Sequence, residues 1–146
     1  MKYAPLVVAM LALAACETLP TGATPPPPGA VAIPSGSLEL GDWRNANEAT
    51  TLAAFQQNVN ARYAAGVETS AATADLRRSE FTCGNAPPVT DGRGDPPAQV
   101  CRRTTTASGC THTWQVHLFD ANDRLTRTRG LYDRRCGNEG LLGGPG

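Results

Sequence analysis

"CTHTWQVHLFD", residues 110–120, alternates with a period of two residues. Successive side chains of a β-strand point to opposite faces, so one face of an extended chain here would carry Cys110, His112, Trp114, Val116 and Leu118. The last three are the large apolar members of that set, and we expect them to form the core face. The stretch therefore predicts a half-buried strand.

Turn-forming residues separate this strand from a neighbour on each side. The turn "DANDR" (120–124) leads into "LTRTRGLYDRRC" (125–136), whose threonines and tyrosine favour a strand, and the two strands should form an antiparallel hairpin. On the other side, "AQVCRRTTT" (98–106) predicts a third strand, which "ASG" (107–109) turns into the tryptophan strand. We expect a three-stranded antiparallel meander.

Upstream of the meander the pattern becomes helical. Four large residues recur at steps of three, four and four and share one helix face: Leu52, Phe55, Val59 and Tyr63. Asn45 with Glu48 predicts a capping box at the start, and Gly66 predicts the end. A second, shorter helix is expected in "ETSAATADLRRSE" (68–80), with Thr69 or Ser70 as its cap. The predicted fold class is α+β, two N-terminal helices packed on the three-stranded meander.

The first fifteen residues have the layout of a signal peptide, with a cation at Lys2 and an apolar run from about 6 to 12. The run is shorter than the roughly 20 residues that a membrane-spanning helix needs. It ends in "LAAC" (13–16), which resembles the lipobox of bacterial lipoproteins and predicts lipidation of Cys16. The alternative is an ordinary signal peptide in which Cys16 occurs by chance. In lipoproteins of Gram-negative bacteria an Asp after the cysteine favours the inner membrane; Glu17 here favours a lipid anchor in the outer membrane, on its periplasmic face.

Composition then divides the rest of the chain. Residues 17–41 contain six prolines and four glycines and no aromatic residue, so 16–41 is expected to be the lipidated N-terminus and a proline-rich tether. Residues 42–137 are expected to form one small α+β domain, and 138–146 a flexible Gly-rich tail.

Four cysteines remain once Cys16 is assigned to the lipid, and an even number in an exported chain predicts two disulfides that staple the domain. If the last hairpin turns near Asn122, residues 110 and 133 lie opposite one another, which makes Cys110 and Cys136 natural partners. Cys83 is then left with Cys101. Zinc is the alternative, with His112 close to Cys110, but the cysteine spacings of 17, 8 and 25 intervening residues do not fit the usual metal-site spacing.

Catalytic and cofactor chemistry find little support in the sequence. His112 and His117 lie on opposite faces of one strand, no G-x-S-x-G motif is present, and paired cysteines leave no thiol nucleophile. The acids form no close pair in an apolar setting. Thirteen basic and thirteen acidic residues give a net charge of zero, which does not favour nucleic acid. We expect no enzyme, no catalytic residue, no metal and no cofactor.

The C-terminal half of the chain has an excess of arginine over acidic residues. Seven arginines against three acids lie between Cys101 and Cys136, a local net charge of 7 − 3 = +4. Five are candidate partner-binding residues: Arg124, Arg127, Arg129, Arg134 and Arg135. Alternation predicts Arg127 and Arg129 on one strand face with Leu125 and Leu131 at either end. That face is either a recognition surface for carboxylates or phosphates, or a solvated one that protects a sheet edge.

The order of elements, with "RYAAGVETSAATADL" (62–76) and "TWQVHLFD" (113–120) before a turn, resembles the small outer-membrane lipoproteins of the SmpA/OmlA type. The resemblance covers about residues 45–136. It implies an α+β module and a role auxiliary to the β-barrel assembly machinery. The four cysteines and the long insert before Cys101 depart from the family's pattern.

Two functions follow as expectations. The first is a membrane-anchored periplasmic interaction or scaffold lipoprotein, auxiliary to cell-envelope assembly, whose partner is an envelope protein or peptidoglycan and not nucleic acid. The alternative is a lipoprotein inhibitor of an envelope-attacking hydrolase, which would insert the loop "PPVTDGRGDPP" (87–97).

Overall fold

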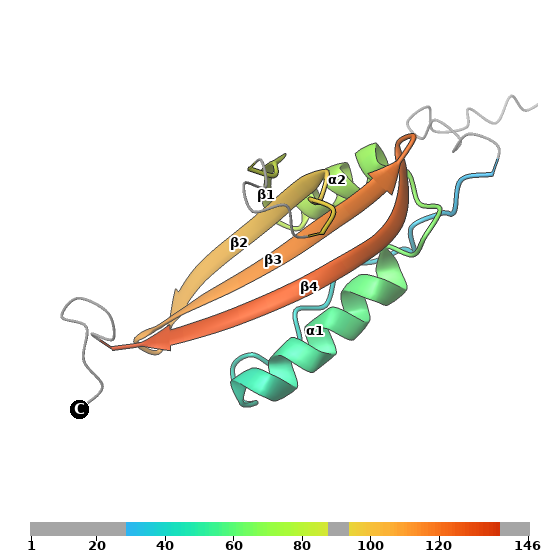
Figure 1. Cartoon of the computed structure of the whole chain (residues 1–146). Coiled ribbons are helices and arrows are strands. Elements are labelled where there is room, and N and C mark those ends of the chain that lie inside the picture. The colour runs from blue at the N-terminus through green and yellow to red at the C-terminus, as the bar shows by residue number, and fades with distance from the viewer. Residues whose placement is uncertain (1–28, 88–93, 138–146) are drawn as a thin grey trace, which may run out of the picture.

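Two helices precede a four-stranded antiparallel sheet in the computed structural model, which describes residues 29–87 and 94–137 (Figure 1). Cys16, the signal peptide, the tail 138–146 and residues 88–93 of the proline-flanked loop lie outside these residues. The elements follow one another along the chain: α1 (Glu48–Arg62), α2 (Thr69–Arg78), β1 (Thr82–Asn85), β2 (Gln99–Ala107), β3 (Cys110–Ala121) and β4 (Arg124–Cys136). Their order in the sheet is also β1-β2-β3-β4.

The α+β class is confirmed, and the strand count is corrected from three to four. The additional strand, β1, has four residues, includes a glycine and shows no alternation of apolar side chains, so it carries no periodic signal. It pairs with β2 so that Cys83 lies directly opposite Cys101. These two cysteines are bonded, as are Cys110 and Cys136, which confirms the expected disulfides and their pairing.

The register of the last hairpin differs from the prediction. Cys110 lies opposite Cys136 itself, and the partner of Asp133 is Thr113. Two features cause the difference. The turn consists of Asn122 and Asp123, both at positive φ, as a two-residue hairpin turn requires. In addition, β4 contains one extra residue between the partners of Phe119 and Asp120, a β-bulge at position 126.

Both helices cover the same face of the sheet, which is the face expected to form the core. Trp114, Val116 and Leu118 are fully buried there. They pack with the large residues of the α1 face, of which Phe55 and Val59 are also fully buried. The close approach of α1 to β4 occurs at Gly130, where an added Cβ would lie 3.1 Å from the Gln56 Cα atom. α1 therefore rests directly on the backbone of β4.

The helix ends differ in detail from the expected caps. The N-cap of α1 is Asn47, whose side chain accepts a bond of 2.8 Å from the Thr50 amide, while Asn45 bonds Asp42 instead. α1 ends at Arg62, before Gly66. α2 begins after Glu68, which makes no side-chain cap. The expected caps, Thr69 and Ser70, are the first two residues of the helix, and the Thr69 hydroxyl donates to Asp120.

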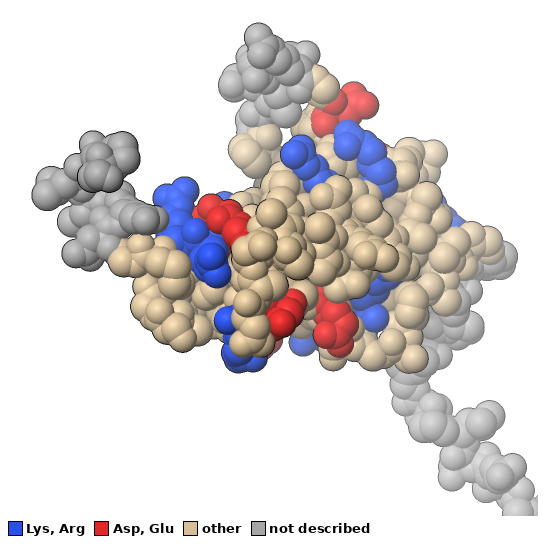
Figure 2. All heavy atoms as spheres, turned by 90° about the horizontal axis from the view of Figure 1, so that it is seen from below, with Lys and Arg blue, Asp and Glu red and all other residues tan. Residues whose placement is uncertain are grey.

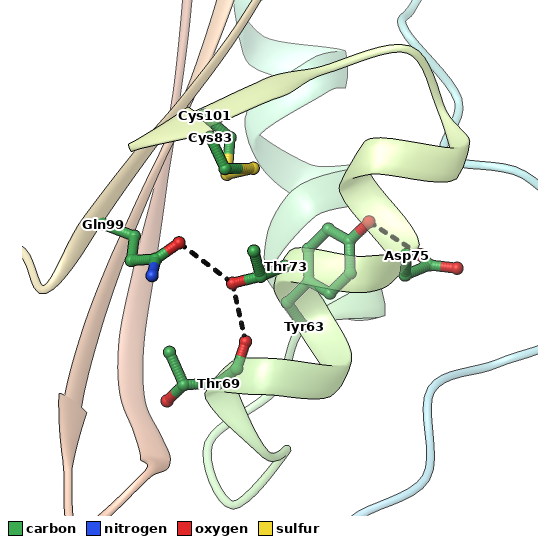
Figure 3. Close-up of a disulfide and its surroundings, with 7 residues drawn as sticks. All are labelled: Tyr63, Thr69, Thr73, Asp75, Cys83, Gln99 and Cys101. Atoms are coloured by element: carbon green, nitrogen blue, oxygen red, sulfur yellow. Dashed lines mark hydrogen bonds between the residues drawn. A yellow bond between two sulfur atoms is a disulfide. The ribbon is translucent and has the colours of Figure 1, made fainter. Parts of the chain in front are cut away.

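α2 is tied to both the sheet and α1 by buried polar side chains. The Thr73 hydroxyl lies 3.2 Å from the Gln99 side chain of β2 and 2.8 Å from the Thr69 carbonyl, next to the Cys83–Cys101 disulfide (Figure 3). On the other side of the helix, the Tyr63 hydroxyl donates to Asp75 at 2.8 Å (Figure 3). These bonds fix the short helix against β2 and α1.

The described chain before α1 packs on the domain, although residues up to 41 were assigned to the tether. Leu38 is 6% exposed and belongs to the core. The Arg62 guanidinium donates to the Gly36 carbonyl at 2.6 Å, and the Trp114 indole N–H donates to the Leu40 carbonyl at 3.2 Å. The packed region thus begins well before residue 42. Neither described helix is long and apolar enough to cross a membrane.

Candidate functional site: a basic sheet face

The second face of the sheet, which is turned toward the viewer in Figure 1, carries no helix among the described residues. Its side chains follow from the register: Cys101 and Val116 are partners on the buried face, so Arg102 and Gln115, one position along, point to the other side. We call the outward side chains of β2, β3 and β4 the basic sheet face. Its charged residues are four arginines and one acid: Arg102, Arg127, Arg129, Arg135 and Asp133.

The bulge at Thr126 decides which β4 residues reach this face. Leu125, at 2% exposed, belongs to the core, and so do Gly130 and Tyr132. Strict alternation would turn Arg127 and Arg129 to the same side as Leu125. One extra residue reverses the alternation, because the side-chain period of a strand is two. The predicted face with Leu125 at one end is therefore wrong, although Leu131 lies on it.

The structure divides the five candidate arginines among three places. Arg127, Arg129 and Arg135 lie on the basic sheet face and are exposed. Arg134 points to the opposite side, where it is the cross-strand partner of the buried His112. Arg124 stands at the hairpin turn, 3.4 Å from the Gly66 carbonyl.

Arg102 belongs to the same face and was not among the candidates. It lies opposite Gln115, next to the row that holds His117 and Arg129. The disulfide offered the signal that could have found it. Cys101 is fully buried and bonded to Cys83, so its neighbour Arg102 points to the other face of the strand.

Most of the arginine charge on this face is not neutralised by the described residues. Among residues 29–87 and 94–137, Arg135 is the only one of the four with an ion pair, to Asp133 at 3.1 Å, and both side chains are largely exposed. Arg127 lies over the Phe119 ring, 3.5 Å from its centre. By contrast Arg103, on the helix side, pairs with Glu80 at 2.6 Å and donates to the Ser79 carbonyl.

His117 extends the polar character of the face without adding charge at neutral pH. It lies between Val100 and Arg129 across the strands. Burial lowers the pKa of His117, and the neighbouring charge of Arg129 lowers it further. Acidification would add a fifth positive group to the face, at a lower pH than for an unperturbed histidine.

The helix side of the molecule has a different character. Helix α1 carries only two charged residues, Glu48 and Arg62, and Arg62 is buried. Seen from below the view of Figure 1, the surface is mostly uncharged, with basic and acidic side chains in small separate groups (Figure 2). On the open sheet face, by contrast, the register places four arginines against one acid.

His112 is held inside the domain. It is 4% exposed, and its Nδ1 atom lies 2.7 Å from the Tyr132 hydroxyl. Burial is the main cause that lowers the pKa of His112, so its ring is neutral at pH 7. Within the described parts of the chain no three His, Cys, Asp or Glu side chains are grouped so that they could hold a metal ion.

Comparisons of the chain with family models, with curated proteins and with solved structures find no match.

Proposed function

We propose that the chain is a membrane-anchored interaction lipoprotein of the cell envelope, and that its basic sheet face binds an acidic surface of a partner protein. The observation that carries this proposal is the distribution of charge: four arginines and one aspartate stand on the single sheet face that no described helix covers. Arg102, on β2, and Arg129, on β4, are two strands apart, which is about 10 Å.

An open sheet face of this kind suits a protein better than a small ligand. The sheet is constrained by a two-residue turn at each end of the β2–β3–β4 meander, by the Cys110–Cys136 disulfide between β3 and β4, and by the Cys83–Cys101 disulfide between β1 and β2. Guanidinium groups pair with carboxylates in two-pronged geometry, and complementary charge raises the rate and the specificity of association. Val100, Leu131 and the Phe119 ring supply apolar area between the arginines.

The envelope as the setting rests on the N-terminus. The lipobox-like ending at Cys16 and the order of elements shared with the SmpA/OmlA-type lipoproteins both support a module held at the outer membrane and auxiliary to envelope assembly. Replacing Cys16 by Ser should abolish incorporation of a labelled fatty acid and release the chain from the membrane fraction. Equal labelling of both proteins would remove the anchor from the proposal.

The binding surface is tested by photo-crosslinking in cells. A crosslinking amino acid placed at Thr104, on the basic sheet face, should capture a protein that the same group at Gln57, on α1, does not. The double change Arg127→Glu with Arg129→Glu should abolish the capture, since reversing paired charges costs about 2–5 kcal/mol of binding free energy when they are buried on association. Arg77→Glu, an exposed arginine of α2, is the matched control.

The captured protein must meet a chemical criterion. Its crosslinked site should lie in an acidic surface, and the capture should weaken as the salt concentration rises. Undiminished capture by the folded double variant would leave the arginines as edge charges, and capture of a cell-wall hydrolase through residues 94–97 would favour the inhibitor alternative.

A further inference from the structure

A hollow of about 340 Å³ opens on the opposite side of the sheet, beside the Cys110–Cys136 disulfide. It lies where β4 ends, the β2–β3 turn begins and the chain enters α1. Its polar and aromatic lining comes from all three segments: Trp43, Arg44, Asn45, Ser108, His112 and Arg134. We call it the arginine–tryptophan pocket.

The charge of this pocket is positive and is not balanced from within. None of the lining residues is acidic. Among the described residues, neither Arg44 nor Arg134 forms an ion pair with a carboxylate. The pKa of His112 is lowered, mainly by burial, while a backbone hydrogen bond at Ala107 partly opposes this and the charge of Arg134 lowers the pKa further, so His112 does not raise the positive charge of the pocket at neutral pH. The two guanidinium groups therefore set the character of the pocket.

The aromatic wall is held in place by the core. The Trp43 ring meets the His112 ring at 4.7 Å and the buried Trp114 ring at 5.4 Å, both edge to face. The Arg44 guanidinium lies 4.3 Å from the centre of the Trp43 ring. A planar group over an indole leaves its N–H edge free to donate, so this contact orients Arg44 without using its hydrogen bonds.

The opposite wall is fixed by the hairpin. Arg134 is the cross-strand partner of His112, and the disulfide joins the strands two residues further on. One N–H of the Asn45 amide is bonded to Asp42 at 2.8 Å, and the charged donors of the pocket are Arg44 and Arg134, with the Ser108 hydroxyl beside them. Donors of this kind, close to an aromatic surface, fit an anionic group attached to a small organic body.

We propose that the arginine–tryptophan pocket binds a small ligand through an oxyanion, a carboxylate or a phosphate group. The two guanidinium groups hold the oxyanion, and the Trp43 ring contacts the part of the ligand that carries it. This site is independent of the basic sheet face, because Arg134 and Arg135 are neighbours in sequence that point to opposite sides of β4.

Trp43 supplies a direct readout. The chain has two tryptophans, and Trp114 is fully buried, so a ligand-induced change of fluorescence that is lost in Trp43→Phe reports on the pocket. The full-length protein is titrated with inorganic phosphate and with N-acetylalanine. The neutral amide of N-acetylalanine is the control. Saturable binding of phosphate only, or of N-acetylalanine only, identifies the oxyanion, and binding of both supports a general oxyanion site.

Arg134→Gln and Arg135→Gln form the matched pair of variants. Arg134→Gln should weaken anion binding about tenfold or more, the effect of one charged hydrogen bond, while Arg135→Gln should change it less than about twofold. Arg134→Lys keeps the positive charge at this position. Binding that is retained in Arg134→Lys and lost in Arg134→Gln would show that the loss comes from the missing charge and not from a loss of the fold. The proposal is overturned if neither anion binds saturably, or if Arg135→Gln weakens binding as much as Arg134→Gln.

Discussion

Asp75 is a buried acid whose replacement should destabilise the fold strongly. It is 4% exposed and accepts bonds from the Arg62 Nε atom at 2.7 Å, from the Tyr63 hydroxyl at 2.8 Å and from Arg78 at 2.7 Å. Arg62 is itself buried and also holds the Gly36 carbonyl. Asp75 therefore links α2, α1 and the segment that precedes α1.

The destabilisation expected for Asp75→Asn comes from the Arg62 charge, which stays buried without its partner. The amide keeps the shape of the side chain, but Arg62 loses its counter-charge inside the domain, and breaking a buried pair in this way costs about 3–5 kcal/mol of the free energy of unfolding. Tyr63→Phe removes one hydrogen bond and should cost about 1 kcal/mol. Arg78→Ala should cost less than about 1 kcal/mol, because that side chain is largely exposed.

Acid should reduce the difference in the free energy of unfolding between the wild-type protein and Asp75→Asn. Burial alone would raise the pKa of Asp75, but bonds from Arg62, Arg78 and Tyr63 outweigh it and lower the pKa. A carboxyl whose pKa is lower in the folded state stabilises the fold above its unfolded pKa, near 3.9, and loses that contribution as pH falls through the folded value.

Urea unfolding of the oxidised protein at pH 7 and below pH 4 measures both effects. A loss below about 1 kcal/mol for Asp75→Asn at pH 7 would refute the role of the buried pair. A loss of stability in Asp75→Asn that is the same at pH 7 and below pH 4 would also refute this role.

Three further predictions concern the sheet. Gly130→Ala should cost about 1–3 kcal/mol in denaturant unfolding because its Cβ would strike α1, whereas Gly84→Ala meets open space and should be neutral; equal effects would contradict the close approach. Removing either disulfide by a paired change to serine should cost about 3 kcal/mol, since the loops span 18 and 26 residues, and unchanged thermal unfolding would contradict this. Arg129→Gln should raise the pKa of His117 in an NMR titration and Arg135→Gln should leave it nearly unchanged; no rise with Arg129→Gln would refute the coupling.

The periodic parts of the chain could be predicted from sequence because burial imposes the period. The alternation around Trp114 and the helical spacing of Phe55 and Val59 each mark a face that must leave water, and the structure buries those faces. The disulfide pairing was also predictable, since a hairpin brings Cys110 near Cys136 over a range of registers. An error of three residues in the register did not change the partner.

The elements that sequence did not predict lack a period of their own. β1 forms a strand because it is bonded to β2 through the Cys83–Cys101 disulfide and pairs with the edge of β2. Both are tertiary contacts. Leu38 is buried by side chains from elements that follow it, so its proline-rich surroundings gave the opposite indication. The arginine–tryptophan pocket joins residues 43 and 134, which no local pattern connects.

The bulge at Thr126 links the fold to both proposed binding surfaces. Leu125, Gly130 and Tyr132 must all face the helices, and an uninterrupted strand cannot do this because position 125 is odd while 130 and 132 are even. One extra residue resolves the conflict. The same residue sends Arg127 and Arg129 to the open face and Arg134 to the pocket. A chain without it would have to expose Leu125 or turn two arginines into the core, so the packing of α1 on β4 itself separates the two sets of arginines.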